Sequence, residues 1–215
     1  MEDEIKQVVD FVEECIQKAE RLESKITEEV AMLRGFSSPK IRHLLNNLCS
    51  FEGCYYLEIG TWGGSTLIPA LWDNPVSNVL AIDDFSQFGP EQNNGFDAKK
   101  GLFENLEKYK DHVKRSGFWE GSMSKLPVSA RPPANVFFYD GPHDAFQTEW
   151  AIISYGQRCS DRFILIVDDW ELTPEVQAGT NKALEHFEVV HKWELKKAAG
   201  YHEGIAIFLL KGVED

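Results

Sequence analysis

Acidic residues recur where short apolar runs of this sequence end. They occupy five such places: Glu58, then Asp83 with Asp84, then Glu120, then Asp140, and finally Asp168 with Asp169. One carboxylate at the end of a strand is often only a helix cap. A series of them along one rim of a sheet is more than sheet building requires. Carboxylates gathered there are suited to accepting ligand hydroxyls or to holding a cation.

The first of these runs leads into a glycine-rich turn, YLEIGTWGGST at 56–66. Glycines let the backbone turn tightly and approach a ligand, and the helix that follows offers unpaired N–H groups. Gly60, Gly63 and Gly64 give the spacing GxxGG, which differs from the GxGxxG of dinucleotide-binding loops. Glu58, two residues before Gly60, would repel a pyrophosphate but suits a positively charged group. The turn therefore disfavours a nicotinamide-dependent oxidoreductase.

The second run ends in a pair of acids that could hold a sugar ring. Asp83 follows Glu58 by 25 residues, a spacing at which an acid can accept both ribose hydroxyls of an adenosine ligand. Asp84 stands beside it, and the sequence does not separate the two. An adenosine-containing ligand is thus expected at this edge.

The elements that must position these acids alternate between strand and helix. Buried parallel strands read as continuous apolar runs, and such runs occupy 54–60, 78–85, 135–140, 162–169 and 204–211, with weaker strands at 113–119 and 187–195. Helical patterns lie at 64–73, 97–110, 144–157 and 175–186. This alternation predicts an α/β fold with a doubly wound, mostly parallel seven-stranded sheet.

The first fifty residues have a different, purely helical texture. Apolar residues at helical spacing predict one helix from Glu2 to about Arg34, ended by Gly35, and a second that begins at Ser38-Pro39. We expect residues 1–50 to form a helical cap in the same domain as the α/β part, 51–215. The long amphipathic helix is also a candidate surface for pairing two copies of the chain.

Composition and charge narrow the class of partner. The 215-residue chain carries a formal net charge of −13, which argues against nucleic acid and against an anionic membrane surface, since both attract basic proteins. A small-molecule substrate is expected instead. Its four cysteines have no metal-ligand spacing, the N-terminus is acidic where a signal peptide would be basic, and no apolar stretch reaches 18 residues. These features predict a cytoplasmic protein.

Taken together, the segments LEIGTWGGST, VLAIDDF, EGSMSKLP, FFYDGPHD and LIVDDW resemble a class I S-adenosylmethionine-dependent methyltransferase. The resemblance covers roughly residues 54–211. Within the class, the chain is similar to small bacterial and phage-type O-methyltransferases of sugars and antibiotic scaffolds and to their metal-dependent, catechol-type relatives. It implies a Rossmann-like methyltransferase fold and S-adenosylmethionine as the cofactor.

The resemblance also implies a set of cofactor-binding residues. Glu58 and Gly60 would line the methionine side of the cofactor, Asp83 would hold the ribose, and other positions would complete the site. The implied set is Glu58, Gly60, Gly64, Ser65, Asp83, Gly121, Ser122 and Asp140. Trp62 or Trp119 would pack either on the ligand or in the core, and the 85–96 loop, with Phe85, Phe88 and Phe96, would be either a lid or a plain connector.

For catalysis, the resemblance points to the ends of two neighbouring strands. Asp140, Asp168 and Asp169 match positions that bind a divalent cation such as Mg²⁺, although they could instead bind backbone amides and cap a helix. Asp140 and His143 are the expected catalytic residues, with the imidazole as proton acceptor. Pro142 replaces an acid found in many relatives, which leaves the general base open.

The sequence therefore predicts a methyltransferase that methylates a hydroxyl of a small sugar- or phenol-type substrate. The alternative is an adenosine- or nucleotide-binding module without methyl transfer.

Overall fold

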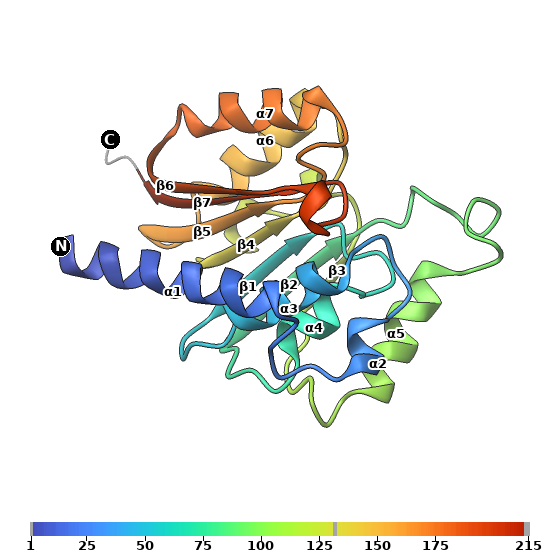
Figure 1. Ribbon diagram of the computed structural model, residues 1–215. Helices are drawn as coiled ribbons and strands as arrows, with labels where there is room; N and C mark the ends of the chain where they lie inside the picture. The colour runs from blue at the N-terminus through green and yellow to red at the C-terminus, as the bar shows by residue number, and fades with distance from the viewer. Residues whose placement is uncertain (1, 131–132, 213–215) are drawn as a thin grey trace.

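A seven-stranded β-sheet forms the centre of the protein, and helices cover both of its faces (Figure 1). The computed structural model describes residues 2–130 and 133–212. The strands are β1 (Tyr55–Ile59), β2 (Asn78–Asp83), β3 (Phe118–Glu120), β4 (Val136–Tyr139), β5 (Arg162–Val167), β6 (Phe187–Leu195) and β7 (Ile205–Gly212). Each predicted strand is present, and the weak strand expected at 113–119 is shorter and displaced toward 120.

The strand order is β3-β2-β1-β4-β5-β7-β6. Neighbours from β3 through β5 are parallel, while β7 runs antiparallel to both β5 and β6. The predicted doubly wound, mostly parallel sheet is confirmed. The chain moves outward in one direction after β1 and in the other after β4, so the order reverses between these strands. In such sheets, ligands bind beyond the carboxyl ends of the strands at this reversal.

Two hydrophobic cores lie on opposite faces of the sheet. The first joins the sheet to α1 (Glu2–Glu20), α2 (Glu28–Ala31), α3 (Pro39–Leu48), α4 (Leu67–Leu71) and α5 (Ala98–Lys108). The second joins it to α6 (Ala145–Gly156) and α7 (Pro174–Leu184). Short 3-10 turns complete the described chain: η1 (Met123–Lys125), η2 (Val128–Ala130) and η3 (Lys197–Ala199). Burial on both sides explains why the central strands read as unbroken apolar runs.

The prediction of one helix from Glu2 to Arg34 is wrong. The helix α1 ends at Glu20, and Leu22 takes a left-handed conformation with φ +56°. Contacts with α3 hold the next residues outside a helix: the Ser24 hydroxyl lies 2.8 Å from Nδ1 of His43, and the Lys25 amide donates to Asn46 at 3.0 Å. Tertiary hydrogen bonds thus override the local apolar periodicity.

The helix α3 begins where the sequence predicted. The Ser38 hydroxyl accepts a hydrogen bond from the amide of Ile41, and Pro39 occupies the first turn. The apolar side of α1 packs on the protein itself, with Val12, Cys15 and Ala19 buried in the first core. Pairing of two copies through α1 therefore stays a prediction.

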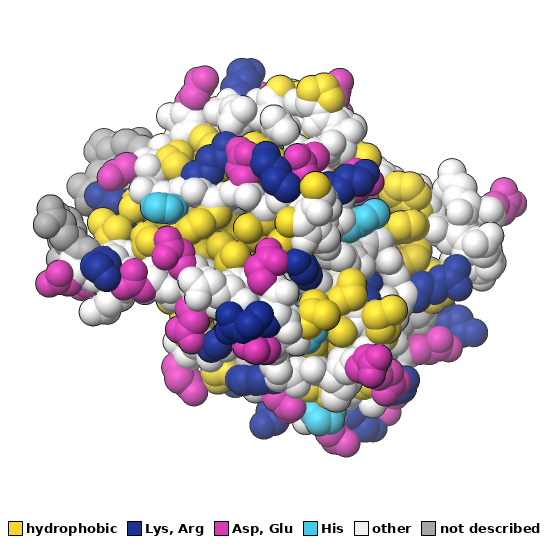
Figure 2. All heavy atoms as spheres, in the orientation of Figure 1, with side chains coloured by type: hydrophobic (Ala, Val, Ile, Leu, Met, Phe, Trp, Pro, Cys, Tyr) yellow, Lys and Arg dark blue, Asp and Glu magenta, His cyan; other side chains and the backbone are white. Residues whose placement is uncertain are grey.

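Basic and acidic side chains are interspersed on the face shown in Figure 2, and a hydrophobic band lies between α1 and the β6–β7 edge. Partly buried residues of β6, among them Trp193 and Leu195, pack against the first core there. Within the described residues, no helix is both long enough and apolar enough to cross a bilayer.

Candidate active site

A cavity of about 470 Å³ opens beyond the carboxyl ends of the parallel strands, where the strand order reverses. Seven of the predicted cofactor, catalytic and metal residues line it: Gly60, Asp83, Gly121, Ser122, Asp140, His143 and Asp169. They come from the ends of β1, β2, β3, β4 and β5. Residues separated by up to about 110 positions in the sequence thus lie close together, because the carboxyl ends of parallel strands all lie at one edge of the sheet.

The turn after β1 brings backbone against backbone at Gly60. Its φ of +93° is in the left-handed region, and a Cβ atom there would lie 1.7 Å from the carbonyl oxygen of Asp140. Only glycine permits this approach. The amide of Gly60 donates to the carbonyl of Ile82 at 2.9 Å. The glycine therefore joins the ends of β1, β2 and β4 at the floor of the cavity.

Glu58 lies behind this turn, without contact with the cavity. Its side chain is 0% exposed, and its carboxylate accepts hydrogen bonds from the hydroxyls of Tyr56, Thr61 and Thr66 at 2.6, 2.8 and 2.9 Å. Burial raises the pKa of Glu58 to about 7, and the three hydroxyls partly oppose that rise. The residue fixes the shape of the turn from inside.

Gly64 and Ser65 are likewise absent from the cavity lining. Both are buried, and Ser65 packs against Gly35 of the N-terminal segment. Their positions fit a role in supporting the turn. The structure therefore separates the predicted cofactor residues into two groups, with Glu58, Gly64 and Ser65 behind the turn and the others along the cavity.

Asp83 faces the cavity and also ties two loops together. One carboxylate oxygen accepts the amide of Trp62 at 2.6 Å, and the other accepts the amide of Phe85 at 2.7 Å. Burial raises the pKa of Asp83, against the lowering effect of these amides. Asp84 also lines the cavity, but its side chain is exposed and accepts the amide of Ser86 at 3.0 Å.

Gly121 and Ser122 close the side of the cavity beyond β3. The amide of Gly121 donates to the carbonyl of Asp83 at 2.9 Å, and the Ser122 hydroxyl caps the turn η1 by accepting the amide of Ser124. Trp119 lies behind, with its indole against Gly121, whereas Trp62 lines the cavity. The two tryptophans that the sequence left undecided thus have different surroundings.

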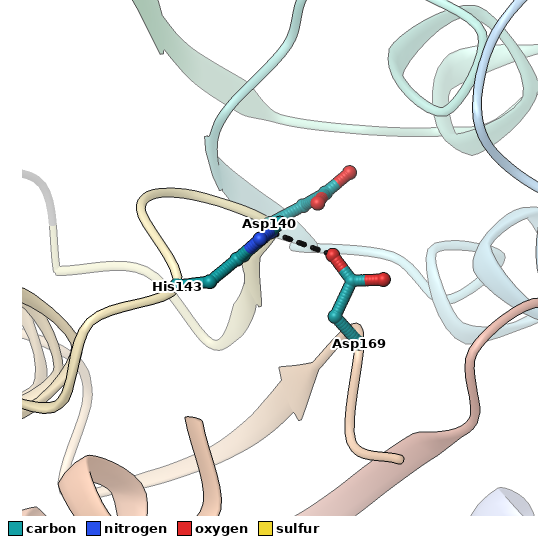
Figure 3. A group of neighbouring side chains, drawn as sticks. All are labelled: Asp140, His143 and Asp169. Carbon is teal, nitrogen blue, oxygen red and sulfur yellow. Dashed lines mark ion pairs between the residues drawn. The ribbon is translucent and has the colours of Figure 1, made fainter. Parts of the chain in front are cut away.

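Asp140, His143 and Asp169 gather at the ends of β4 and β5 (Figure 3). One ligand atom from each lies within 4.8 Å of the others. Nε2 of His143 and a carboxylate oxygen of Asp169 are 2.7 Å apart, and this hydrogen bond raises the pKa of His143. Such a set can hold a cation or take up a proton.

Asp168 lies behind this cluster and does not line the cavity. It is 3% exposed, and its Oδ1 atom has no hydrogen-bond partner among the described residues. Burial is the largest cause of the raised pKa values of both Asp140 and Asp168, and neighbouring carboxylates add to it. The predicted metal set of Asp140, Asp168 and Asp169 thus differs from the cavity-facing set, in which His143 takes the place of Asp168.

Further cavity residues escaped the sequence reasoning. They lie on the segment before α3, at the start of α6 and in loops beside β5 and β7: Phe36, Gln147, Leu172, His202 and Glu203. None of them stands at the end of a predicted strand, so no periodic pattern marked them. Pro142 does line the cavity, and its carbonyl accepts the Tyr139 hydroxyl at 2.7 Å.

The fold is similar to that of solved methyltransferase structures. TrmN from Thermus thermophilus superposes with a TM-score of 0.59 and 15% identity, over 86% of this chain and 52% of that chain, so this chain spans about half the length of TrmN. Precorrin-6y C5,15-methyltransferase from Geobacter metallireducens gives a TM-score of 0.58 and 14% identity, over 87% and 93% of the two chains.

A third similar structure is the O-methyltransferase from Bacillus cereus in complex with SAH, with a TM-score of 0.55 and 14% identity over 94% of this chain and 91% of that chain. No protein-family model matches the chain, and no curated protein matches it in sequence. At these identities, the comparisons establish a shared Rossmann-like methyltransferase fold.

Proposed function

We propose that this protein is an S-adenosylmethionine-dependent methyltransferase that methylates a hydroxyl of a small molecule of the sugar or phenol type. The observation that carries the proposal is the cavity itself. It lies at the reversal of strand order, and glycine backbone, a β2 carboxylate and an acidic cluster converge on it. The shared fold of solved methyltransferases supports the same conclusion.

The lining residues suit the parts of S-adenosylmethionine. Asp83, with a carboxylate at the end of β2, would accept the ribose hydroxyls, while Gly121 and Ser122 would flank the adenine. The backbone of Gly60 and Asp140, which meet at the cavity, would line the methionine part. The sulfonium is positive, so the carboxylates of Asp140 and Asp169 favour it over a neutral or anionic ligand.

Methyl transfer requires alignment and the removal of one proton. The acceptor oxygen forms a bond to the methyl carbon as the carbon–sulfur bond breaks, and its electron pair neutralises the sulfonium. His143 takes the hydroxyl proton. In the neutral tautomer that donates Nε2–H to Asp169, Nδ1 carries the accepting lone pair, and the raised pKa of His143 makes it a better base.

A divalent cation fits the acidic cluster. Asp140 and Asp169 face the cavity together, and Asp168 behind them buries a carboxylate oxygen without a hydrogen-bond partner in the described chain. Asp140 and Asp169 would hold the ion, which is suited to carboxylate oxygens when it is Mg²⁺. When bound, it would lower the pKa of a substrate hydroxyl. Asp168 would balance its charge from behind.

Isothermal titration calorimetry tests the proposed cofactor. S-adenosylmethionine should bind the purified protein with a dissociation constant on the order of micromolar, whereas NAD and ATP should not compete with it, because their phosphates meet the acidic lining. Binding of ATP or NAD with no binding of S-adenosylmethionine would replace the methyltransferase with a nucleotide-binding module.

A further inference from the structure

Three aromatic rings from separate parts of the chain form one wall of the cavity. The ring centroids of Phe36 and Trp62 are 5.0 Å apart, and those of Phe36 and Phe88 are 5.4 Å apart. All three residues line the cavity. Phe36 and Phe88 are 51% and 45% exposed, so together with Trp62 they present a continuous apolar surface to the cavity. We call these three residues the aromatic wall.

The wall is supported from behind by Phe96. The centroid of the Phe96 ring lies 4.9 Å from that of Trp62, and the guanidinium of Arg34 lies over the Phe96 ring, 4.5 Å from its centroid. A Cβ atom on Gly101 would lie 2.3 Å from the Phe96 ring. The ring can therefore pack against α5 only because residue 101 has no side chain. Arg34 also donates to the carbonyl of Asn93 at 2.6 Å. These two contacts of Arg34 connect the N-terminal segment to the 85–96 loop.

The backbone adopts unfavourable conformations to present two of these rings. Trp62 has a φ of +42° and Phe88 a φ of +53°, a region that bulky residues avoid. The Trp62 amide is held by Asp83, and the side chain of Asn93 donates to the carbonyls of Phe88 and Gly89. Strained residues of this kind concentrate where a site requires them.

Phe85 does not belong to the wall. Its ring faces Phe118 at 5.7 Å, on the side of the first core. The three phenylalanines of the 85–96 loop thus have three roles, because Phe85 anchors the loop, Phe96 supports Trp62 and Phe88 is presented to the cavity.

The charge of the cavity adds a second constraint on its occupant. Its charged lining residues are all acidic: Asp83, Asp84, Asp140, Asp169 and Glu203. None of the described lining residues is lysine or arginine. The protein itself therefore supplies no lysine or arginine partner for a carboxylate or phosphate on the acceptor, and its basic side chains there are the histidines His143 and His202.

We propose that Phe36, Trp62 and Phe88 are the specificity-determining acceptor subsite, and that it selects a planar aromatic ring without negative charge. The proposal rests on the proposed function and deepens it, since it favours a phenol-type acceptor over a sugar. Aromatic rings gain most from offset stacking or edge contact with another flat ring. A ring held on the wall shares one cavity with His143 and Asp140, where its hydroxyl would react.

Calorimetry with three probes tests the subsite, on the protein with and without S-adenosylhomocysteine. 2-Naphthol offers a neutral planar ring, 2-naphthoate the same ring with a negative charge, and methyl glucoside a neutral sugar. The parent protein should bind 2-naphthol at least about tenfold more tightly than either of the others. Because each probe is also titrated alone, the result does not depend on cofactor binding.

Two variants and a matched control locate the binding. Phe36→Ala and Phe88→Ala should each weaken 2-naphthol binding about tenfold while leaving the affinity for S-adenosylhomocysteine unchanged. Phe103→Ala is the control, because Phe103 is 46% exposed on α5 and does not line the cavity. It should bind 2-naphthol like the parent.

Several results would overturn the subsite. They are absence of 2-naphthol binding to the parent, equal binding of 2-naphthoate, and tighter binding of methyl glucoside. A loss of S-adenosylhomocysteine affinity in Phe36→Ala or Phe88→Ala would assign the wall to the cofactor instead. If S-adenosylhomocysteine does not bind the parent but 2-naphthol binding behaves as described, the methyltransferase proposal fails and the ring subsite stands.

Discussion

Two groups of acids at neighbouring strand ends have opposite surroundings. Glu58, on β1, is fully buried, and its oxygens accept three hydroxyl hydrogen bonds. Asp140 and Asp169, at the ends of β4 and β5, face the cavity beside His143, and the buried Asp168 behind them has an oxygen without a partner in the described residues. The carboxylate of Glu58 has hydrogen-bond partners within the protein. The aspartates at the ends of β4 and β5 keep charge and hydrogen-bonding capacity that a ligand in the cavity could use.

The difference distinguishes an acid that stabilises the fold from acids that are available for binding or catalysis. A buried polar group with all its partners stabilises one conformation, which here is the turn that carries Gly60. Clustered carboxylates that raise each other's pKa lower the stability of the unliganded fold and are common at functional sites. The two groups meet where Gly60 contacts the backbone of Asp140. Substitutions on each side should therefore alter different quantities.

The largest effect is expected at Asp140. Asp140→Ala should lower methyl transfer roughly a thousandfold and abolish any stimulation by Mg²⁺, because it removes a carboxylate from the proposed cation site. S-adenosylmethionine should still bind, although less tightly, because Asp169 and the residues proposed for the ribose and adenine are unchanged. Single-turnover assays with and without Mg²⁺, together with calorimetry, measure both. Loss of cofactor binding in the variant, with no Mg²⁺ effect in the parent, would remove the cation from the mechanism.

Glu58→Ala should act on stability instead. It leaves the hydroxyls of Tyr56, Thr61 and Thr66 buried without their acceptor and opens a small cavity, so the free energy of unfolding should fall by about 3 kcal/mol. Urea denaturation near pH 7 measures the loss. A variant as stable as the parent would show that the hydroxyl cluster around Glu58 is dispensable, and the contrast between the two groups would lose its physical basis.

Glu58→Gln tests the buried environment of Glu58 through the pH dependence of the free energy of unfolding. The pKa of Glu58 rises from its ordinary value of 4.5 to about 7 on folding, so the folded state binds the proton more tightly than the unfolded state. The stability that this proton supplies is lost as the pH rises through that window, by about 2.5 kcal/mol between roughly pH 5 and pH 8. The glutamine variant cannot ionise, so relative to the parent it should gain that amount over the same range. A constant difference between the two proteins would contradict the raised pKa.

The smallest effect concerns the adenosyl end of the cavity. Asp83→Ala should weaken binding of S-adenosylhomocysteine about tenfold by removing the acceptor of the ribose hydroxyls. Circular dichroism should show a folded protein, although the loops at Trp62 and Phe85 lose an anchor. Matched titrations of Asp84→Ala provide the control. If only that variant binds more weakly, the ribose role belongs to Asp84.

The sheet was predictable from sequence because its strands are buried on both faces. Continuous apolar runs at β1, β2, β4, β5 and β7 mark their positions, and the acids at the ends of β1, β2, β4 and β5 mark the rim. The break after α1 was not predictable, because it depends on hydrogen bonds from Ser24 and Lys25 to residues of α3. Local periodicity carries no record of such contacts.

The site was predictable only in part, for a similar reason. A strand end can be inferred from the sequence, but the direction of a side chain cannot. Asp168 and Asp169 are adjacent and chemically identical, yet a φ of +56° at Asp169 accompanies exposure of that residue to the cavity while Asp168 is buried. Phe36 and His202 reach the cavity from segments outside the parallel strands, so only the folded chain identifies them.

The most direct test of the account is a crystal structure of the protein with S-adenosylhomocysteine. The account predicts the ligand in the cavity, with the ribose hydroxyls on Asp83, the adenine beside Gly121 and Ser122, and the sulfur directed toward Asp140. Glu58 should keep its three hydroxyl partners without touching the ligand. A ligand bound outside this cavity would contradict the account. So would a ligand that displaces Thr61 and Thr66 to contact Glu58 directly, because Glu58 is assigned to stabilising the turn and not to binding.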